Sequence, residues 1–167
     1  MISGARTLVI MVALVVIAIA GAAWGWAALT SPFPQRVATP LCTNTRVDAG
    51  DHLYASQITV SVLNASQRVG LASRTLAALS LDGFAIGNTA DAPKHTDVSR
   101  VQIWTSDPTS PAVTLLKDHL PGAKVVERSE NEPGIVVVVG SHFRKVVAGP
   151  RTIAVTTATT VCSPALS

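Results

Sequence analysis

The chain has 167 residues, of which only 14% are charged, and its formal net charge is +3. Beyond an apolar N-terminal stretch, this length leaves room for one domain of roughly 100 residues, a common size for a single core. The thirteen lysines and arginines are scattered and aromatic residues make up 4%, so the composition argues against a nucleic-acid-binding protein, which needs a basic stripe or a stacking surface.

Residues 8–29 read LVIMVALVVIAIAGAAWGWAAL and contain no charged side chain. About 20 helical residues cross the hydrocarbon core of a bilayer, and Trp24 and Trp26 stand near the outer end, as interfacial aromatic residues do. Arg6 precedes the span, and positive charge favours the cytoplasmic side. The sequence therefore predicts residues 1–29 as a short cytoplasmic tail and one transmembrane helix, with the rest of the chain extracytoplasmic.

A cleaved signal peptide is the alternative. Residues 20–22 (AGA) fit a small-x-small cleavage site, but the apolar stretch is longer than the usual core of a signal peptide and continues past that site. Both alternatives place the domain on the same side of the cell membrane, and we expect a single-pass anchor.

Composition also marks the two ends of the predicted domain. Pro32, Pro34 and Pro40 remove backbone hydrogen-bond donors and disfavour a helix, so we predict a proline-containing linker over residues 30–55. Residues 148–167 are rich in threonine and alanine and are predicted to form an extended tail.

The chain has two cysteines, Cys42 and Cys162, and they flank the predicted domain. In an exported protein an even pair indicates a disulfide. Two free thiols are the alternative. A redox or metal pair is disfavoured, because the sequence has no Cys-x-x-Cys and no histidine at ligand spacing.

The first half of the domain, predicted over residues 56–147, begins with a strand and a helix. Residues 58–63 are rich in β-branched side chains and alternate mostly with period two, as a strand does. Residues 70–82 repeat apolar side chains near the helical period, and Gly83 follows where a left-handed cap is often needed. Residues 84–88 are predicted to be a short second strand.

The second half repeats this pattern. Residues 101–104 alternate and predict a third strand, and Ser110 followed by Pro111 is typical of a helix start. Residues 124–127 predict a fourth strand. Residues 135–139 read IVVVV, an unbroken apolar run that predicts a strand covered on both faces or central in a sheet.

This order of elements, β-α-β-β-α-β with a further strand close behind, predicts an α/β (α+β) fold. The pattern is that of a ferredoxin-like, split βαβ domain, in which an antiparallel or mixed sheet carries two helices on one face.

The turn between the first strand and the first helix holds four candidate residues for a ligand site or a scaffold turn: Asn64, Ser66, Arg68 and Gly70. It has a single glycine and lacks the Walker and Rossmann patterns. An asparagine at a strand end favours a local turn, and a glycine at this place favours close approach of helix and sheet. A ligand contact is the alternative, because backbone amides at a helix N-terminus attract anions.

The sequence predicts neither a catalytic nor a metal site. No serine lies in a Gly-x-Ser-x-Gly motif. Four histidines are isolated in sequence and expected to be solvated, with no pair at metal-ligand spacing: His52, His95, His119 and His142. Three glutamates beside Arg128 are expected to lie on a solvated surface loop: Glu127, Glu130 and Glu132. We therefore expect a protein that is not an enzyme and that needs no cofactor.

Five segments, in this order and spacing, resemble the LytR C-terminal domain family. They read ITVSVLNAS, VGLASRTLAALSLDGF, VQIW, PAVTLLKDHLPGAKVV and GIVVVVGSHF, and the resemblance covers residues 58–143. The family often carries an acidic residue just before the closing aromatic residue, Phe143, where this chain has His142.

The resemblance implies an extracytoplasmic domain of Gram-positive, mostly actinobacterial, envelope proteins. In some members it follows a LytR-CpsA-Psr catalytic domain, which attaches glycopolymers to peptidoglycan, and this chain has no block that would hold that domain. We therefore expect a non-catalytic envelope protein that binds cell-wall polymer or another envelope protein and supports envelope integrity or assembly. An accessory or cryptic cell-wall enzyme domain for glycopolymer transfer or hydrolysis is the alternative. Nucleic acid and small-molecule cofactors are not expected as partners.

Overall fold

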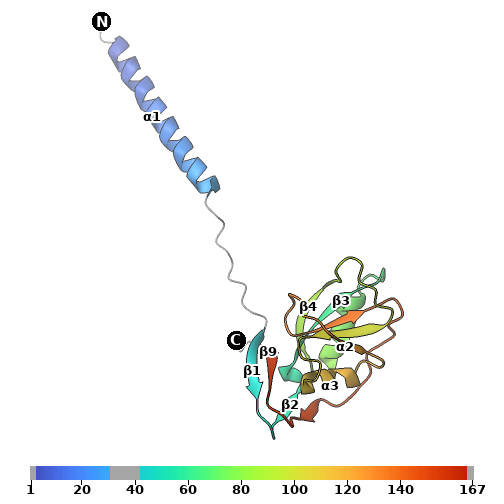
Figure 1. Cartoon of the computed structure of the whole chain (residues 1–167). Helices are drawn as coiled ribbons and strands as arrows, with labels where there is room; N and C mark the ends of the chain where they lie inside the picture. The colour runs from blue at the N-terminus through green and yellow to red at the C-terminus, as the bar shows by residue number, and fades with distance from the viewer. Residues whose placement is uncertain (1–2, 31–41, 165–167) are drawn as a thin grey trace. The chain divides into compact units, whose positions relative to one another are not determined.

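The structure, a computed structural model, describes residues 3–30 and 42–164. The chain divides into two compact units, one within residues 1–38 and the other within residues 39–167 (Figure 1).

The first unit contains the helix α1 (Ser3–Thr30). Its segment from Leu8 to Trp26 has a mean hydropathy of 2.6 and no buried residues. By length and composition this segment can cross a membrane, and a membrane anchor and a signal sequence share that property. The predicted apolar N-terminal helix is therefore confirmed, and its role as a permanent single-pass anchor stays a prediction.

The second unit is built on a five-stranded mixed sheet with the strand order β4-β3-β7-β5-β6. Its strands are β3 (Thr59–Asn64), β4 (Ala85–Asp91), β5 (Val101–Thr105), β6 (Lys124–Glu127) and β7 (Ile135–Val139), and its helices are α2 (Leu71–Leu81) and α3 (Pro111–Asp118). Each of the strands and helices predicted within the domain is present. The run IVVVV forms β7 at the centre of the sheet, as its apolar composition indicates.

The predicted ferredoxin-like topology is wrong. In a split βαβ motif another strand lies between the two strands that a helix connects. Here α2 connects β3 to its parallel neighbour β4, and α3 connects β5 to its parallel neighbour β6. Strand β7 then lies between the two units, parallel to β3 and antiparallel to β5. The domain is therefore two ordinary βαβ units joined through a central fifth strand.

The two helices lie on one face of this sheet, as predicted. The apolar residues of α2 and α3 share a buried cluster with alternate residues of β3, β5 and β7, among them Val60, Ile103 and Val137. The crossover from β3 to β4 and the crossover from β5 to β6 both lead outward from the centre of the sheet, and β3 and β5 run in opposite directions. Two crossovers of the same hand therefore place their helices on the same face of the sheet. A smaller cluster around Trp104 and Val138 covers the opposite face.

The predicted linker and tail are corrected by the structure, because parts of both belong to the folded unit. Strand β1 (Cys42–Val47) pairs antiparallel with β9 (Thr159–Pro164), and β2 (His52–Tyr54) pairs antiparallel with β8 (Thr152–Ala154). A short 3-10 helix, η1 (Ala55–Gln57), leads into β3. Figure 1 shows β1 beside β9. These strands are held in the folded unit by backbone pairing between segments that are distant in sequence. The linker residues 31–41 lie outside the described residues.

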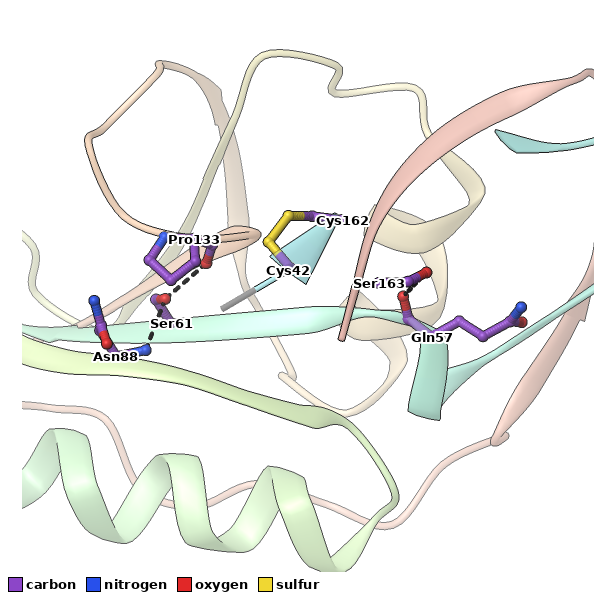
Figure 2. The surroundings of a disulfide bond; sticks show 7 residues. All are labelled: Cys42, Gln57, Ser61, Asn88, Pro133, Cys162 and Ser163. Carbon is purple, nitrogen blue, oxygen red and sulfur yellow. Dashed lines mark hydrogen bonds between the residues drawn. A yellow bond between two sulfur atoms is a disulfide. The ribbon is translucent and has the colours of Figure 1, made fainter. Parts of the chain in front are cut away.

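Cys42 and Cys162 form a disulfide, as the sequence predicts (Figure 2). Their Cα atoms are 5.3 Å apart, and the bond joins positions 120 residues apart in sequence. The hydroxyl of Ser163 next to it donates a hydrogen bond of 2.9 Å to the carbonyl of Gln57. The disulfide therefore closes the ribbon of β1 and β9, and Ser163 ties that ribbon to the entry of β3.

His119 is an exception to the expectation of solvated histidines, because its side chain is fully buried. One ring nitrogen lies 3.1 Å from a carboxylate oxygen of Asp82 and the other lies 2.8 Å from the carbonyl oxygen of Pro150. The ring also meets Phe84 edge to face at 5.0 Å. His119 thus joins the C-terminal ends of α2 and α3 to the segment that leads into β8.

The cap of α3 gives a first testable prediction. The hydroxyl of Ser110 accepts a hydrogen bond of 3.3 Å from the backbone N–H of Ala112, and Pro111 occupies the first turn. Ser110→Ala removes this acceptor from a buried helix end, so we expect a loss of about 1 kcal/mol in the free energy of unfolding, measured by urea denaturation. Lys117→Ala on the exposed side of α3 is the control, and equal losses in both variants would contradict the capping role.

Candidate functional site

Three of the four candidate residues of the turn after β3 are hydrogen-bonded to one another. The side-chain oxygen of Asn64 accepts hydrogen bonds from the backbone N–H and the hydroxyl of Ser66, at 3.1 and 2.8 Å. The Asn64 amide donates to the carbonyl of Arg68 at 3.1 Å, and the Ser66 hydroxyl accepts from the backbone N–H of Arg68. These bonds fix the path of the chain from β3 to α2, which is what a scaffold turn does.

Arg68 is held by the end of the domain. Its guanidinium donates a hydrogen bond of 2.8 Å to the carbonyl of Phe143 and a longer one, 3.4 Å, to the carbonyl of Ser141. The arginine thereby joins the turn after β3 to the loop after β7, although 75 residues separate Arg68 from Phe143. Its role in ligand binding stays a prediction.

Gly70 stands immediately before α2 with a φ of 70°. This left-handed conformation suits glycine, whereas a β-branched residue is strained there. Gly70→Val should therefore lower the free energy of unfolding by about 2 kcal/mol, read from a thermal melt, with less effect on ligand binding than on folding. A melt unchanged by this substitution would contradict the scaffold role. Ser73→Val, at an exposed position of α2, is the control for the β-branched side chain.

A crevice opens beside this turn at the carboxyl ends of β3 and β4. Its volume is about 450 Å³. Half of its lining is hydroxyl and amide side chains, with one carboxylate, and the lining includes Asn64, Ser66, Asp91, Thr96 and Ser141. Open α/β sheets commonly bind ligands outside the carboxyl ends of parallel strands, and β3, β4 and β7 all end here. Arg68 and Gly70 do not line this crevice.

His95, also in the lining, has a φ of 66°. Among the non-glycine residues that the structure describes, it alone has a positive φ. Residues held in this region cost energy and are found more often at ligand sites than elsewhere. The sequence gives no signal for it, since a lone histidine in a loop is ordinary.

His142 follows Ser141, which lines the crevice, and has two hydroxyls near its ring. Its Nδ1 atom is 3.2 Å from the Oγ atoms of both Ser99 and Ser141, and all three side chains are exposed. Such a pair resembles the nucleophile and base of a hydrolase. Among the residues that the structure describes, no carboxylate is hydrogen-bonded to His142. The third group of a catalytic triad, which orients the imidazole, therefore has no counterpart among these residues.

The glutamate loop departs from its prediction, because two of its three carboxylates line a second cavity. Glu130 is only 20% exposed and accepts a hydrogen bond of 2.6 Å from Arg128, whose guanidinium stacks 4.0 Å above the ring of Trp104. Glu130 and Glu132 both line a cavity of about 270 Å³ beside the disulfide. Glu127 is exposed, as predicted. The cavity is formed by segments that are distant in sequence, so it could not be predicted from the sequence of the loop alone.

Within residues 3–30 and 42–164, the structure places no three of the histidine, cysteine, aspartate and glutamate side chains so that they could hold a metal ion. The polar groups gathered at the two cavities are carboxylates, hydroxyls, amides and the imidazole of His95, which bind ligands through hydrogen bonds and charge.

The fold and the crevice define a small mixed α/β domain that follows an apolar, membrane-compatible helix. Residues 57–143 match the family model LytR_C, described as LytR cell envelope-related transcriptional attenuator. This match covers more than half of the chain, and the chain therefore belongs to the LytR_C family, as its resemblance indicates.

A solved structure with a similar fold is the crystal structure of the soluble domain of a conserved hypothetical secreted protein from Mycobacterium marinum. It aligns with a TM-score of 0.50 and 21% sequence identity, over 63% of this chain and 76% of that one. Comparison with curated proteins finds no match.

Proposed function

We propose that this chain is a non-catalytic, single-pass envelope protein whose extracytoplasmic domain binds cell-wall polymer and so supports envelope integrity or assembly. The N-terminus is cytoplasmic and α1 anchors the domain at the cell membrane. The observation that carries the proposal is the crevice at the carboxyl ends of β3, β4 and β7 in a domain whose family is envelope-related.

The chemistry of the crevice favours a hydroxyl-rich ligand. Asn64, Ser66 and Ser141 offer neutral hydrogen-bond groups, and such groups can pair with the hydroxyls of a glycopolymer without the desolvation cost of buried charge. The crevice is open rather than enclosed and so suits one unit of a long chain. Another envelope protein is the competing partner, and crosslinking distinguishes the two.

The test places a photo-reactive amino acid at Gln67, which is exposed in the lining of the crevice, in the full-length protein in intact cells. We expect a crosslinked product between the protein and wall polymer, and a wall-degrading enzyme should reduce the size of this product. The same residue at Lys117, exposed on α3, is the control and should give none. A product whose size changes only on treatment with a protease would show that the partner is a protein.

The pair of hydroxyls at His142 favours a second candidate function, that of a cell-wall hydrolase or transferase domain. An imidazole 3.2 Å from a hydroxyl could activate it for attack on a glycopolymer linkage. If this function holds, His142→Ala abolishes turnover of wall fragments and leaves crosslinking at Gln67 intact, because His142 does not line the crevice. If the binding function holds, the wild type itself shows no turnover.

A further inference from the structure

A second site lies at the other end of the strands of the sheet from the crevice. Strand β5 runs antiparallel to β3 and β7, so its carboxyl end lies with the starting ends of those two strands. The cavity of about 270 Å³ sits there and is lined by β1 and β9 at the disulfide, by the entries of β3 and β7, and by the loops after β5 and β6. This volume lies slightly below the usual range for drug-sized ligands, so it suits one small group.

Two carboxylates in this lining lack a cationic partner. Glu130 is paired with Arg128, but Asp107 and Glu132 form no ion pair in the part of the chain that the structure describes. Asp107 accepts hydrogen bonds from the backbone and hydroxyl of Thr109, and Glu132 accepts one from the amide of Asn88. Each carboxylate keeps further acceptor capacity. Two uncompensated negative charges at one small cavity favour a cationic ligand.

An unsatisfied hydroxyl in the same lining points independently to a ligand. Thr59 is 1% exposed, and among the described residues its Oγ1 atom is the one buried side-chain oxygen without a hydrogen-bond partner. Ser61, two residues along β3, is fully paired: it donates to the carbonyl of Pro133 at 2.7 Å and accepts from the backbone N–H of Asn88 at 3.0 Å (Figure 2). A buried hydroxyl without a partner costs free energy, and a bound donor group would remove that cost.

We propose that this cavity binds a small ligand through a primary ammonium group. Asp107 and Glu132 are its counter-ions, and the hydroxyl of Thr59 is a hydrogen-bond acceptor. The apolar side chains of Ile58, Ile135 and Val161 in the same lining contact the body of the ligand. An amino sugar and the free amino group of a peptide share this chemistry. The proposal does not rest on polymer binding at the crevice, because none of these residues lines it.

The test uses the full-length chain, labelled with nitrogen-15, in a non-ionic detergent at about pH 6, where an amino group is protonated. D-glucosamine and the amide of alanyl-alanine are titrated separately, and N-acetylglucosamine, which lacks the charge, is the control ligand. We expect the backbone N–H signals of Thr59, Ser106 and Gly134 to shift with one of the two amines and not with N-acetylglucosamine. The amine that binds more tightly identifies the source of the ammonium group.

Matched variants separate binding from folding. The double variant Asp107→Asn, Glu132→Gln keeps one acceptor oxygen on each side chain and removes both charges, so it should weaken amine binding at least about tenfold. Glu127→Gln, an exposed glutamate outside the cavity, should leave binding unchanged. Thr59→Val should weaken binding about threefold or more without lowering the melting temperature, because it removes an unpaired buried hydroxyl.

Three results would overturn the proposal: equal binding of N-acetylglucosamine and glucosamine, unchanged amine affinity in the double variant, or no shift at these signals with either amine. Polymer binding at the crevice is measured separately, with insoluble wall material, so either proposal can fail alone.

Discussion

Replacing both Cys42 and Cys162 by serine is expected to lower the free energy of unfolding by about 4 to 5 kcal/mol. The disulfide closes a loop of 120 residues, and in the chain-entropy model such a closure removes this much from the freedom of the unfolded chain. Urea denaturation of the oxidised wild type and the double variant measures the difference. Reducing agent should bring the wild type to the stability of the variant and leave the variant unaffected.

Loss of the disulfide should first loosen the ribbon of β1 and β9. Strand β1 is exposed over most of its length and buries only Val47, so few side-chain contacts hold it once the disulfide is gone. We expect the backbone N–H groups of β1 to lose their protection from hydrogen exchange, while those of the central strand β7 keep theirs. Identical denaturation midpoints for the wild type and the variant would show that the disulfide does not stabilise the fold.

Gly140→Ala is expected to lower the free energy of unfolding by about 3 kcal/mol. Gly140 follows β7, where its backbone N–H donates a hydrogen bond of 2.7 Å to the carbonyl of Arg100. A Cβ added here would collide with the backbone carbonyl groups of Val98 and Ser99. The backbone of this loop cannot move aside freely, because Val98 is buried in the cluster around Trp104.

Ser141→Ala is the control for this substitution, because the neighbouring side chain is exposed. Thermal melts of the two variants should differ widely, with Ser141→Ala within about 0.5 kcal/mol of the wild type. Equal melting temperatures for Gly140→Ala and the wild type would mean that the loop of Val98 and Ser99 relaxes and that the close approach is not needed.

The elements of the central sheet could be predicted because their signals are local. The period-two pattern gave β3, the helical period gave α2, and Ser110 followed by Pro111 gave the start of α3. The pairing of strands could not be predicted in the same way. A split βαβ domain and two ordinary βαβ units have the same order of elements, and they differ in whether another strand lies between the two strands that each helix connects.

Other features depend on contacts between distant segments. Strand β1 is mostly polar and exposed, and half of β9 is threonine and serine, so neither has a clear apolar pattern, and the disulfide was their only signal. His119 was expected to be solvated because its partners, Asp82 and Pro150, are 37 and 31 residues away. The polar turn after β3 was recognised as a unit, but the crevice beside it also needs residues from the loops after β4 and β7.

Co-sedimentation of the full-length protein in non-ionic detergent with purified insoluble sacculi tests the proposed binding of the domain to the cell wall. Sacculi with and without their attached glycopolymer are compared, and the salt concentration is raised to remove contacts between exposed charges. We predict pelleting that resists salt, and the preparation that retains it identifies the polymer. A protein that stays in the supernatant with both preparations would contradict wall binding and leave an envelope protein as the partner.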